Sequence, residues 1–193
     1  RSWIQMNLRQ TGFAQIKNPD GYWENWTSHA KRHRQKWLGD KRFVVSEGNL
    51  KEFLAAYRKV RNIPFFIRHE YIKLIQKKKT AYGNLAHLFL ARERGKNEIA
   101  AGLMVIDLPD INSSLHFASF ILPGARKTSV GAGLIDYWFK RAAKNSLRFL
   151  NFGTIWAPGD PRSWKGFSRF KSQFGLYLIR RPHPLIRFVK GVK

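Results

Sequence analysis

The segment GARKTSVGAGLIDYWFKRAAKNSLRFLNFG, residues 124–153, sets the expected order of elements. It opens with a glycine-rich loop directly after an apolar run that Pro123 ends. Apolar residues at helical spacing follow: Leu134, Ile135, Trp138, Phe139 and Ala142. They predict a helix over 131–145 with one buried side. Residues 147–153 predict a strand. The segment therefore links a strand to a helix and then to a second strand.

The rest of the chain also alternates between the two patterns. Spacing and end signals predict further helices at 24–40, 49–64, 68–79 and 163–175. Asn25 or Thr27 can cap the first, and Asn49 and Glu52 have capping-box spacing in the second. Short apolar runs predict strands at 41–48, 85–93, 98–109, 114–122 and 176–182. Helices, an antiparallel meander and a strand–helix–strand unit predict an α/β fold with a mixed sheet.

The composition indicates a folded, strongly basic protein. The 193 residues carry 36 Lys and Arg against 12 Asp and Glu, a net charge of +24. Such a surface attracts polyanions, although a generally basic proteome would explain it too. The absence of cysteine excludes disulfides, thiolate zinc sites and cysteine nucleophiles. No apolar run spans a bilayer and no signal-peptide pattern opens the sequence, so we expect a cytoplasmic protein.

The loop at 124–133 is a candidate phosphate site. Gly131 and Gly133 allow a ligand to approach the backbone, and the helix that follows offers free N–H groups and partial positive charge. Arg126 and Lys127 add cations. A pyrophosphate such as that of coenzyme A would suit this loop. The alternative is a glycine turn that only leads into the helix.

The segment SWKGFSRFKSQFG, residues 163–175, alternates rings and cations without an acid. On a helix, four rings are expected along one buried side: Trp164, Phe167, Phe170 and Phe174. Lys171 projects into that apolar stripe. One interpretation is that its methylenes cover the rings while its ammonium reaches water. The other is that the ammonium meets a phosphate or a developing negative charge at a cleft wall.

No other pattern indicates a metal or hydrolase site. His29 and His33 have metal-ligand spacing, but no third ligand is evident, and His33 aligns with Trp26 and Trp37, which favours packing. G-x-S-x-G is absent, and the carboxylates are scattered without catalytic spacing. A transferase that works by positioning its substrates fits these residues better.

Several stretches resemble, in order, the Fem family of aminoacyltransferases, which form peptidoglycan bridges, and their FemAB-like relatives. WKGFSRFKSQFG is similar to that family's G-x-x-x-F-K-x-x-F-G block. SHAKRHRQKW resembles its basic helix, and LFLARERGKNEIAAGLMVI resembles its hairpin. The segment 124–153 is similar to the helix and D-f-G strand that precede the F-K block. The likeness runs from Trp23 to Arg181.

The resemblance implies a GNAT (N-acetyltransferase-like) fold, which that family usually carries twice in one chain. It also implies that Lys171 contacts substrate and is catalytic. The general GNAT donor pattern appears only as Thr128-x-x-Gly131-x-Gly133. Asn151 stands where the family has the aspartate of D-f-G.

We therefore expect one GNAT-like domain over residues 1–193, similar to the second half of the family's chains, with an N-terminal tail at 1–22. The sequence begins with Arg1 rather than Met, which leaves open a companion domain upstream.

The predicted function is transfer of an aminoacyl group from aminoacyl-tRNA, or of an acyl group from acyl-CoA, onto an amine acceptor such as a cell-wall precursor peptide. No cofactor or metal is expected. Lys171 is the catalytic candidate, and the candidates for holding the donor are Arg126, Lys127, Thr128, Gly131 and Gly133. The candidates for binding substrate or a polyanion are Lys31, Arg32, Arg34, Lys36, Lys165, Arg169 and Phe170. The alternative is a non-catalytic basic module that binds RNA or an anionic membrane. Peripheral contact with the inner membrane face is compatible with both.

Overall fold

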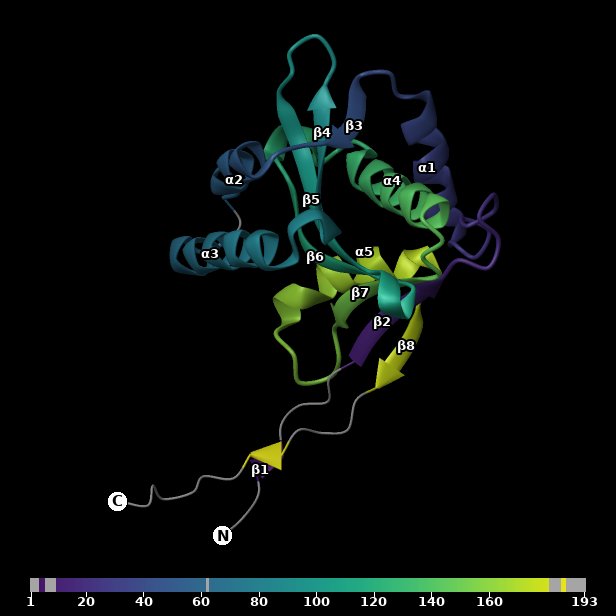
Figure 1. The fold of residues 1–193 in the computed structure, drawn as a ribbon, viewed down its shortest axis with the longest axis vertical. Coiled ribbons are helices and arrows are strands. Elements are labelled where there is room, and N and C mark those ends of the chain that lie inside the picture. The colour runs from purple at the N-terminus through teal and green to yellow at the C-terminus, as the bar shows by residue number, and fades with distance from the viewer. Residues whose placement is uncertain (1–3, 6–9, 62, 181–184, 187–193) are drawn as a thin grey trace.

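The computed structural model describes residues 4–5, 10–61, 63–180 and 185–186, which contain a mixed sheet with helices on both faces (Figure 1). Seven strands follow the order β3-β4-β5-β6-β7-β2-β8. Their bounds are β2 (Gln10–Gln15), β3 (Phe43–Glu47), β4 (Ala86–Glu93), β5 (Ile99–Leu108), β6 (Ser113–Ile121), β7 (Phe149–Ile155) and β8 (Tyr177–Arg180). A separate antiparallel pair joins β1 (Ile4–Gln5) to β9 (Leu185–Ile186).

The helices form a layer on each side of the sheet (Figure 1). On one side α1 (Ser28–Gly39) packs against α4 (Val130–Lys144), and on the other α2 (Leu50–Arg58) packs against α3 (Phe65–Tyr82). The short helix α5 (Lys165–Lys171) lies against β7. Among the described strands of the large sheet, only β6 and β7 pair in parallel, because α4 carries the chain over the sheet between them.

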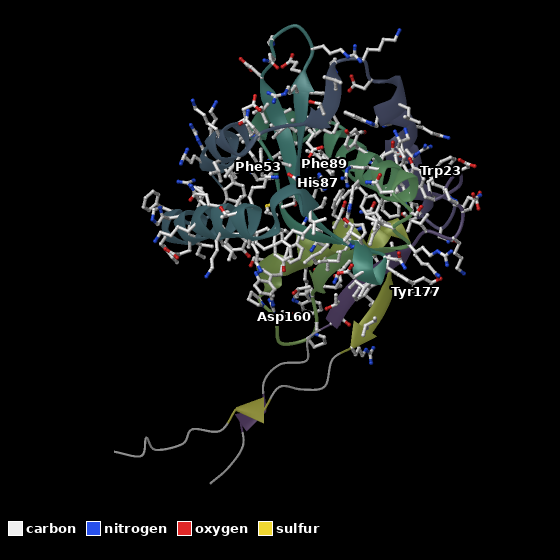
Figure 2. All side chains as sticks on the ribbon, in the orientation of Figure 1. Trp23, Phe53, His87, Phe89, Asp160 and Tyr177 are labelled. Atoms are coloured by element: carbon white, nitrogen blue, oxygen red, sulfur yellow. The ribbon has the colours of Figure 1, made fainter. Side chains whose placement is uncertain are left out.

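Each layer encloses its own apolar core. Phe89 of β4 and Trp138 of α4 belong to the core under α1 and α4, whereas Phe53 of α2 belongs to the core under α2 and α3. Successive side chains of β5 belong alternately to the two cores. Leu103 lies in the core under α1 and α4, and Met104 lies in the core under α2 and α3. Figure 2 shows Phe53 and Phe89 on either side of the sheet.

The predicted caps at the starts of the first two helices are confirmed, whereas the second helix ends at Arg58 rather than near Pro64. The Thr27 hydroxyl accepts a hydrogen bond from the backbone N–H of Ala30 at the start of α1. Asn49 and Glu52 form a reciprocal capping box at the start of α2, so two otherwise unpaired N–H groups are satisfied. Local side-chain chemistry therefore sets both starts.

The prediction of an N-terminal tail at 1–22 is wrong for its described part. Residues 10–15 form β2, an interior strand that pairs with β7 on one side and β8 on the other. The side chain of Ala14 is buried in the core under α4. The sheet thus takes an interior strand from near the start of the chain.

Gly133 allows α1 and α4 to approach each other. The Trp37 ring of α1 lies so close to Gly133 that a Cβ there would overlap it. Gly166 of α5 has open space where its Cβ would be. The two helical glycines therefore differ in the packing that surrounds them.

We expect Gly133→Ala to lower the free energy of unfolding by about 1–3 kcal/mol, because the added methyl must displace the Trp37 ring. The matched change Gly166→Ala should leave it unchanged or raise it by up to about 1 kcal/mol, since alanine loses less backbone entropy in a helix. Denaturant titration measures both. Equal stability of the two variants would contradict this account of the α1–α4 contact.

Candidate functional site

Strands β6 and β7 pair over a short stretch and then separate. Their described pairing joins residues 113–115 of β6 to 149–151 of β7. Beyond it, β6 continues to Ile121 and β7 to Ile155 without pairing to each other. A parallel pair that stops inside a sheet leaves backbone groups facing a gap, and these groups need other partners.

A small cavity of about 70 Å³ lies beside this separation. The helices α4 and α5 supply part of its wall through Gly131, Leu134, Phe167, Phe170 and Lys171. The strands supply apolar side chains together with two polar residues of β6, His116 and Ser119. The walls are thus mostly apolar with a few polar groups, as in many small-molecule sites.

Lys171 closes the gap left by the separating strands. Its Nζ donates hydrogen bonds to the carbonyl oxygen of Phe152 at 2.5 Å and to that of Thr154 at 3.4 Å, both on β7. The same nitrogen lies 4.9 Å from the centre of the Phe167 ring. Burial lowers the pKa of Lys171 to about 8. The ammonium therefore pairs with carbonyls that β6 leaves without partners, and Lys171 lines the cavity.

The buried aromatic stripe expected at 163–175 is wrong in its extent. Only Phe174 of the four rings is buried, whereas the side chains of Trp164, Phe167 and Phe170 are 36–41% exposed. The reason is local: α5 spans only Lys165–Lys171, and 3₁₀ turns at Arg162–Trp164 and Ser172–Phe174 flank it, so the four rings do not share one helical face. Phe167 and Phe170 instead line the cavity.

His116 and Ser119 are site residues that sequence reasoning missed. In a regular strand, residues three apart point to opposite faces. In β6, however, His116 pairs with Val105 and Ala118 pairs with Met104, which leaves Phe117 as a bulge. The bulge brings His116 and Ser119 to the same cavity, where the His116 Nε2 and the Ser119 Oγ lie 3.0 Å apart. Nothing in the sequence marks this bulge.

The His116 imidazole faces the same environment as Lys171. Burial, and then the nearby Lys171 ammonium, lower the pKa of His116 below its usual range. The ring is therefore neutral at neutral pH, and the cavity carries the Lys171 cation without a second one from this histidine.

Only part of the glycine-rich loop reaches the cavity. Gly131 lines it, with Phe170 in ordinary contact distance of the position a Cβ would take. Gly133 does not, because it packs against Trp37, and its assignment to donor binding is therefore corrected. The Thr128 hydroxyl donates to the Ala125 carbonyl at 2.7 Å and thereby shapes the turn.

The two cations of this loop lie outside the cavity lining. Arg126 and Lys127 are exposed just before α4. They remain candidates for donor phosphates that approach the start of that helix from solvent.

The basic residues of α1 do not form one exposed set. Arg32 and Lys36 are exposed and Lys31 is half-buried. Arg34, in contrast, bonds Asp136 at 2.5 Å and stacks 3.8 Å from the centre of the Trp23 ring. Its side chain is only 12% exposed, so its predicted role in binding a polyanion is corrected to a structural ion pair.

Two cations of α5, Lys165 and Arg169, do not line the cavity, unlike Lys171 of the same helix. Lys165 lies 4.3 Å from the centre of the Trp156 ring, and both Lys165 and Arg169 are exposed. They therefore remain candidates for contacting a polyanion outside the cavity.

Neither a metal cluster nor a spanning helix is found in the described part of the chain. There, no three His, Asp or Glu side chains gather to hold a metal ion. The His29 and His33 rings lie 4.5 Å apart, and the His33 Nδ1 lies 3.0 Å from the Ser129 hydroxyl. None of the described helices combines the length and apolar character needed to cross a bilayer.

The low pKa of Lys171 predicts a pH dependence of stability. The ordinary pKa of lysine is 10.5. Between pH 8 and pH 10.5 the Lys171 side chain of the unfolded chain therefore still holds a proton that the folded chain has released. Stability contributed by this group therefore rises with pH across that window. Denaturant titrations of wild type and Lys171→Met should show this rise in wild type and not in the variant. Parallel pH profiles would mean that the ammonium is fully solvated.

Comparisons with known proteins identify the fold. No family model and no curated protein match the chain. Among solved structures, FemX has a TM-score of 0.69 at 12% identity, covering 88% of this chain and 59% of its own. A tandem GNAT protein from the clavulanic acid biosynthesis pathway has a TM-score of 0.57 at 9% identity, covering 94% of this chain and 54% of its own.

A third similar structure is the C-terminal domain of a putative lysylphosphatidylglycerol synthetase from Agrobacterium fabrum. It has a TM-score of 0.55 at 9% identity and covers 95% of this chain and 60% of its own. The chain thus spans 54–60% of the length of these three proteins. At such low identities the likeness concerns the fold. The expected fold class is confirmed: the chain has a GNAT fold that resembles FemX.

Proposed function

We propose that the protein transfers an aminoacyl or acyl group to an amine acceptor, with Lys171 beside the reacting carbonyl. The observation that carries this proposal is the position of the Lys171 ammonium, between two separated strands and at the wall of a cavity. The implied kinship with the Fem family, and the GNAT fold, support the same reaction class. Fold alone does not define an activity, and the residues around the cavity therefore have to support it.

The hydrogen bonds of Lys171 suit it to stabilise negative charge. Two of the three N–H groups of an ammonium are directed to the carbonyls of Phe152 and Thr154, which fixes the nitrogen. The third N–H is then free to meet an oxygen that becomes negative in the transition state. A fixed donor in a water-poor site stabilises such charge strongly, because it need not reorganise during the reaction.

The reaction balances without a cofactor. The acceptor amine attacks the carbonyl carbon of an activated ester or thioester, and its nitrogen forms the new amide bond. The bond from that carbon to the leaving oxygen or sulfur breaks. The proton lost by the amine ends on the leaving group. Lys171 would stabilise the anionic tetrahedral intermediate or the departing atom, and holding the reactants together would lower the remaining barrier.

Between the two donors, we favour aminoacyl-tRNA over acyl-CoA. A net charge of +24 exceeds what one small donor requires, and the exposed Arg32, Lys36, Lys165 and Arg169 can contact an RNA backbone. Arg126, Lys127 and the backbone near Gly131 would hold the donor phosphates at the start of α4. Phe170 lines the cavity and would pack against the transferred group or the terminal nucleotide.

For the acceptor, we propose an amine on a cell-wall precursor peptide. This acceptor is suggested by the resemblance to the Fem family. It is the acceptor of the complete proteins of that family. The location proposed with it is the cytoplasm, where charged tRNA is available.

The second candidate is a non-catalytic basic module that binds RNA or an anionic membrane. The small size of the cavity and the high net charge favour it. In that case the response to polyanions would be salt-dependent and weakly selective.

We expect Lys171→Met to abolish transfer while the fold persists, because methionine fills similar space without an N–H donor. Amide formation is measured with candidate aminoacyl-tRNA and acyl-CoA donors, and circular dichroism verifies the fold. Lys96→Met is the matched control, since Lys96 is exposed in the β4–β5 hairpin and pairs with Glu93. Full activity of Lys171→Met would refute the role assigned to the ammonium.

Thermal shifts discriminate between the donors. Aminoacyl-tRNA should stabilise the protein more than uncharged tRNA at both low and high salt, because the aminoacyl end occupies the cavity. Coenzyme A is tested in parallel, and a larger shift with it would favour acyl transfer. An equal response to every polyanion that vanishes at high salt would support the binding module.

A further inference from the structure

The start of α3 exposes two adjacent aromatic side chains. Phe65 is 73% and Phe66 is 69% exposed, the highest values among the large apolar side chains of the described residues. Ile67, Tyr71 and Leu74 of the same helix are 39–43% exposed. Soluble proteins often expose single apolar residues, but a group on one element marks an interaction surface.

Helical spacing places Phe66, Ile67 and Leu74 toward one side of α3, with Tyr71 at the edge of that side, while Phe65, at the first position of the helix, lies in line with the buried Ile72. Ile67, Tyr71 and Leu74 follow each other at intervals of four and three, so they form one row. Phe66 heads the adjacent row, which continues at intervals of four, three and four with Glu70, Lys73 and Lys77. The opposite side of the helix is buried through Ile72 and Ile75. α3 is thus anchored to the protein on one side, and away from that side it presents Phe66, Ile67 and Leu74 next to Lys73 and Lys77, with Glu70 paired to Lys73.

The charge around this face is strongly one-sided. Residues 53–92 contain nine Lys and Arg and a single acid, Glu70. Glu70 is paired with Lys73 at 2.9 Å. Arg58, Lys59 and Arg61 are exposed where the chain leaves α2 and approaches Phe65. The aromatic pair therefore lies between basic residues on both sides in sequence.

We propose that this α3 surface, formed by Phe65, Phe66, Ile67, Tyr71, Leu74, Lys73 and Lys77, binds the surface of an anionic lipid bilayer. The apolar rows would enter the boundary between head groups and acyl chains. The lysine methylenes would cover the apolar residues while their ammonium groups reach the phosphates. The arginines and lysine after α2 would add attraction to the negative surface.

Charge and side-chain type favour a bilayer over other occupants. A second copy would bring two basic faces together, which like-charge repulsion opposes. Single-stranded RNA stacks on rings, yet the aliphatic Ile67 and Leu74 offer it no flat surface. A lipid surface, in contrast, can contact both the apolar rows and the basic residues beside them. The inference does not rest on the proposed transfer reaction, because α3 covers the other face of the sheet from α4 (Figure 1).

The test measures partition of the full chain to sedimented vesicles made of equal parts phosphatidylcholine and phosphatidylglycerol. The double variant Phe65→Ser, Phe66→Ser should bind at least about tenfold more weakly than wild type, because two exposed rings no longer enter the bilayer. A control variant with Tyr177→Ser and Ile179→Ser removes an exposed apolar pair on β8 and should bind as wild type. Lys73→Glu with Lys77→Glu should also weaken binding, and pure phosphatidylcholine vesicles should bind least.

Equal binding by wild type and the phenylalanine variant would overturn the proposal, because overall charge alone would then explain attraction. A wild-type dimer in gel filtration that becomes a monomer in the phenylalanine variant would also overturn the proposal, because the surface would then contact a second copy of the protein. Stronger competition by single-stranded RNA in wild type than in the phenylalanine variant would assign the rings to RNA instead. Transfer by the phenylalanine variant in vesicle-free solution should match wild type, whereas Lys171→Met should retain vesicle binding. The two proposals therefore fail independently.

Discussion

The hydrogen bonds from Lys171 to the carbonyls of β7 are the interaction on which the candidate site depends. β6 and β7 stop pairing inside the sheet, and a gap of this kind would leave peptide carbonyls without partners. The ammonium occupies the place that the N–H groups of a neighbouring strand would have taken. One side chain therefore satisfies two carbonyls of β7 where the strands separate, and in doing so it places a cation at the cavity. Burial of the nitrogen is the energetic consequence, visible in its lowered pKa.

The elements of the fold could largely be predicted, because they depend on local chemistry. The capping box of Asn49 and Glu52 and the apolar spacing of α4 appear where the sequence places them. The order of the strands in the sheet is harder to predict from the sequence. The sequence predicts a tail where β2 lies, because β2 is a short strand with no hairpin partner next to it in sequence. Its partners lie at the far end of the chain, and long-range pairing leaves no local pattern.

At the site, single-residue chemistry was more predictable than packing. Lys171 stood out because a cation interrupts an apolar spacing, and Gly131 because it precedes a helix. Arg34 looked like its basic neighbours, but its partner Asp136 lies on another helix. Gly133 looked like a ligand glycine, yet it makes room for Trp37. His116 reaches the cavity through a bulge, whose position is set by pairing with β5 rather than by the residues themselves. Such features depend on tertiary contacts and so escape a reading along the chain.

The position of β2 has a consequence for how the chain is made. Residues 10–15 pair with residues 149–155 and 177–180, which the ribosome adds much later. During synthesis this segment remains without its sheet neighbours until β7 and β8 have emerged. The meander of β3 to β6 can assemble earlier, since its pairings are sequential. Completion of the sheet is therefore a late, non-local event that closes a large loop, and such closure slows folding. A nascent chain that stalls before β7 would display an unpaired strand, which is a template for aggregation.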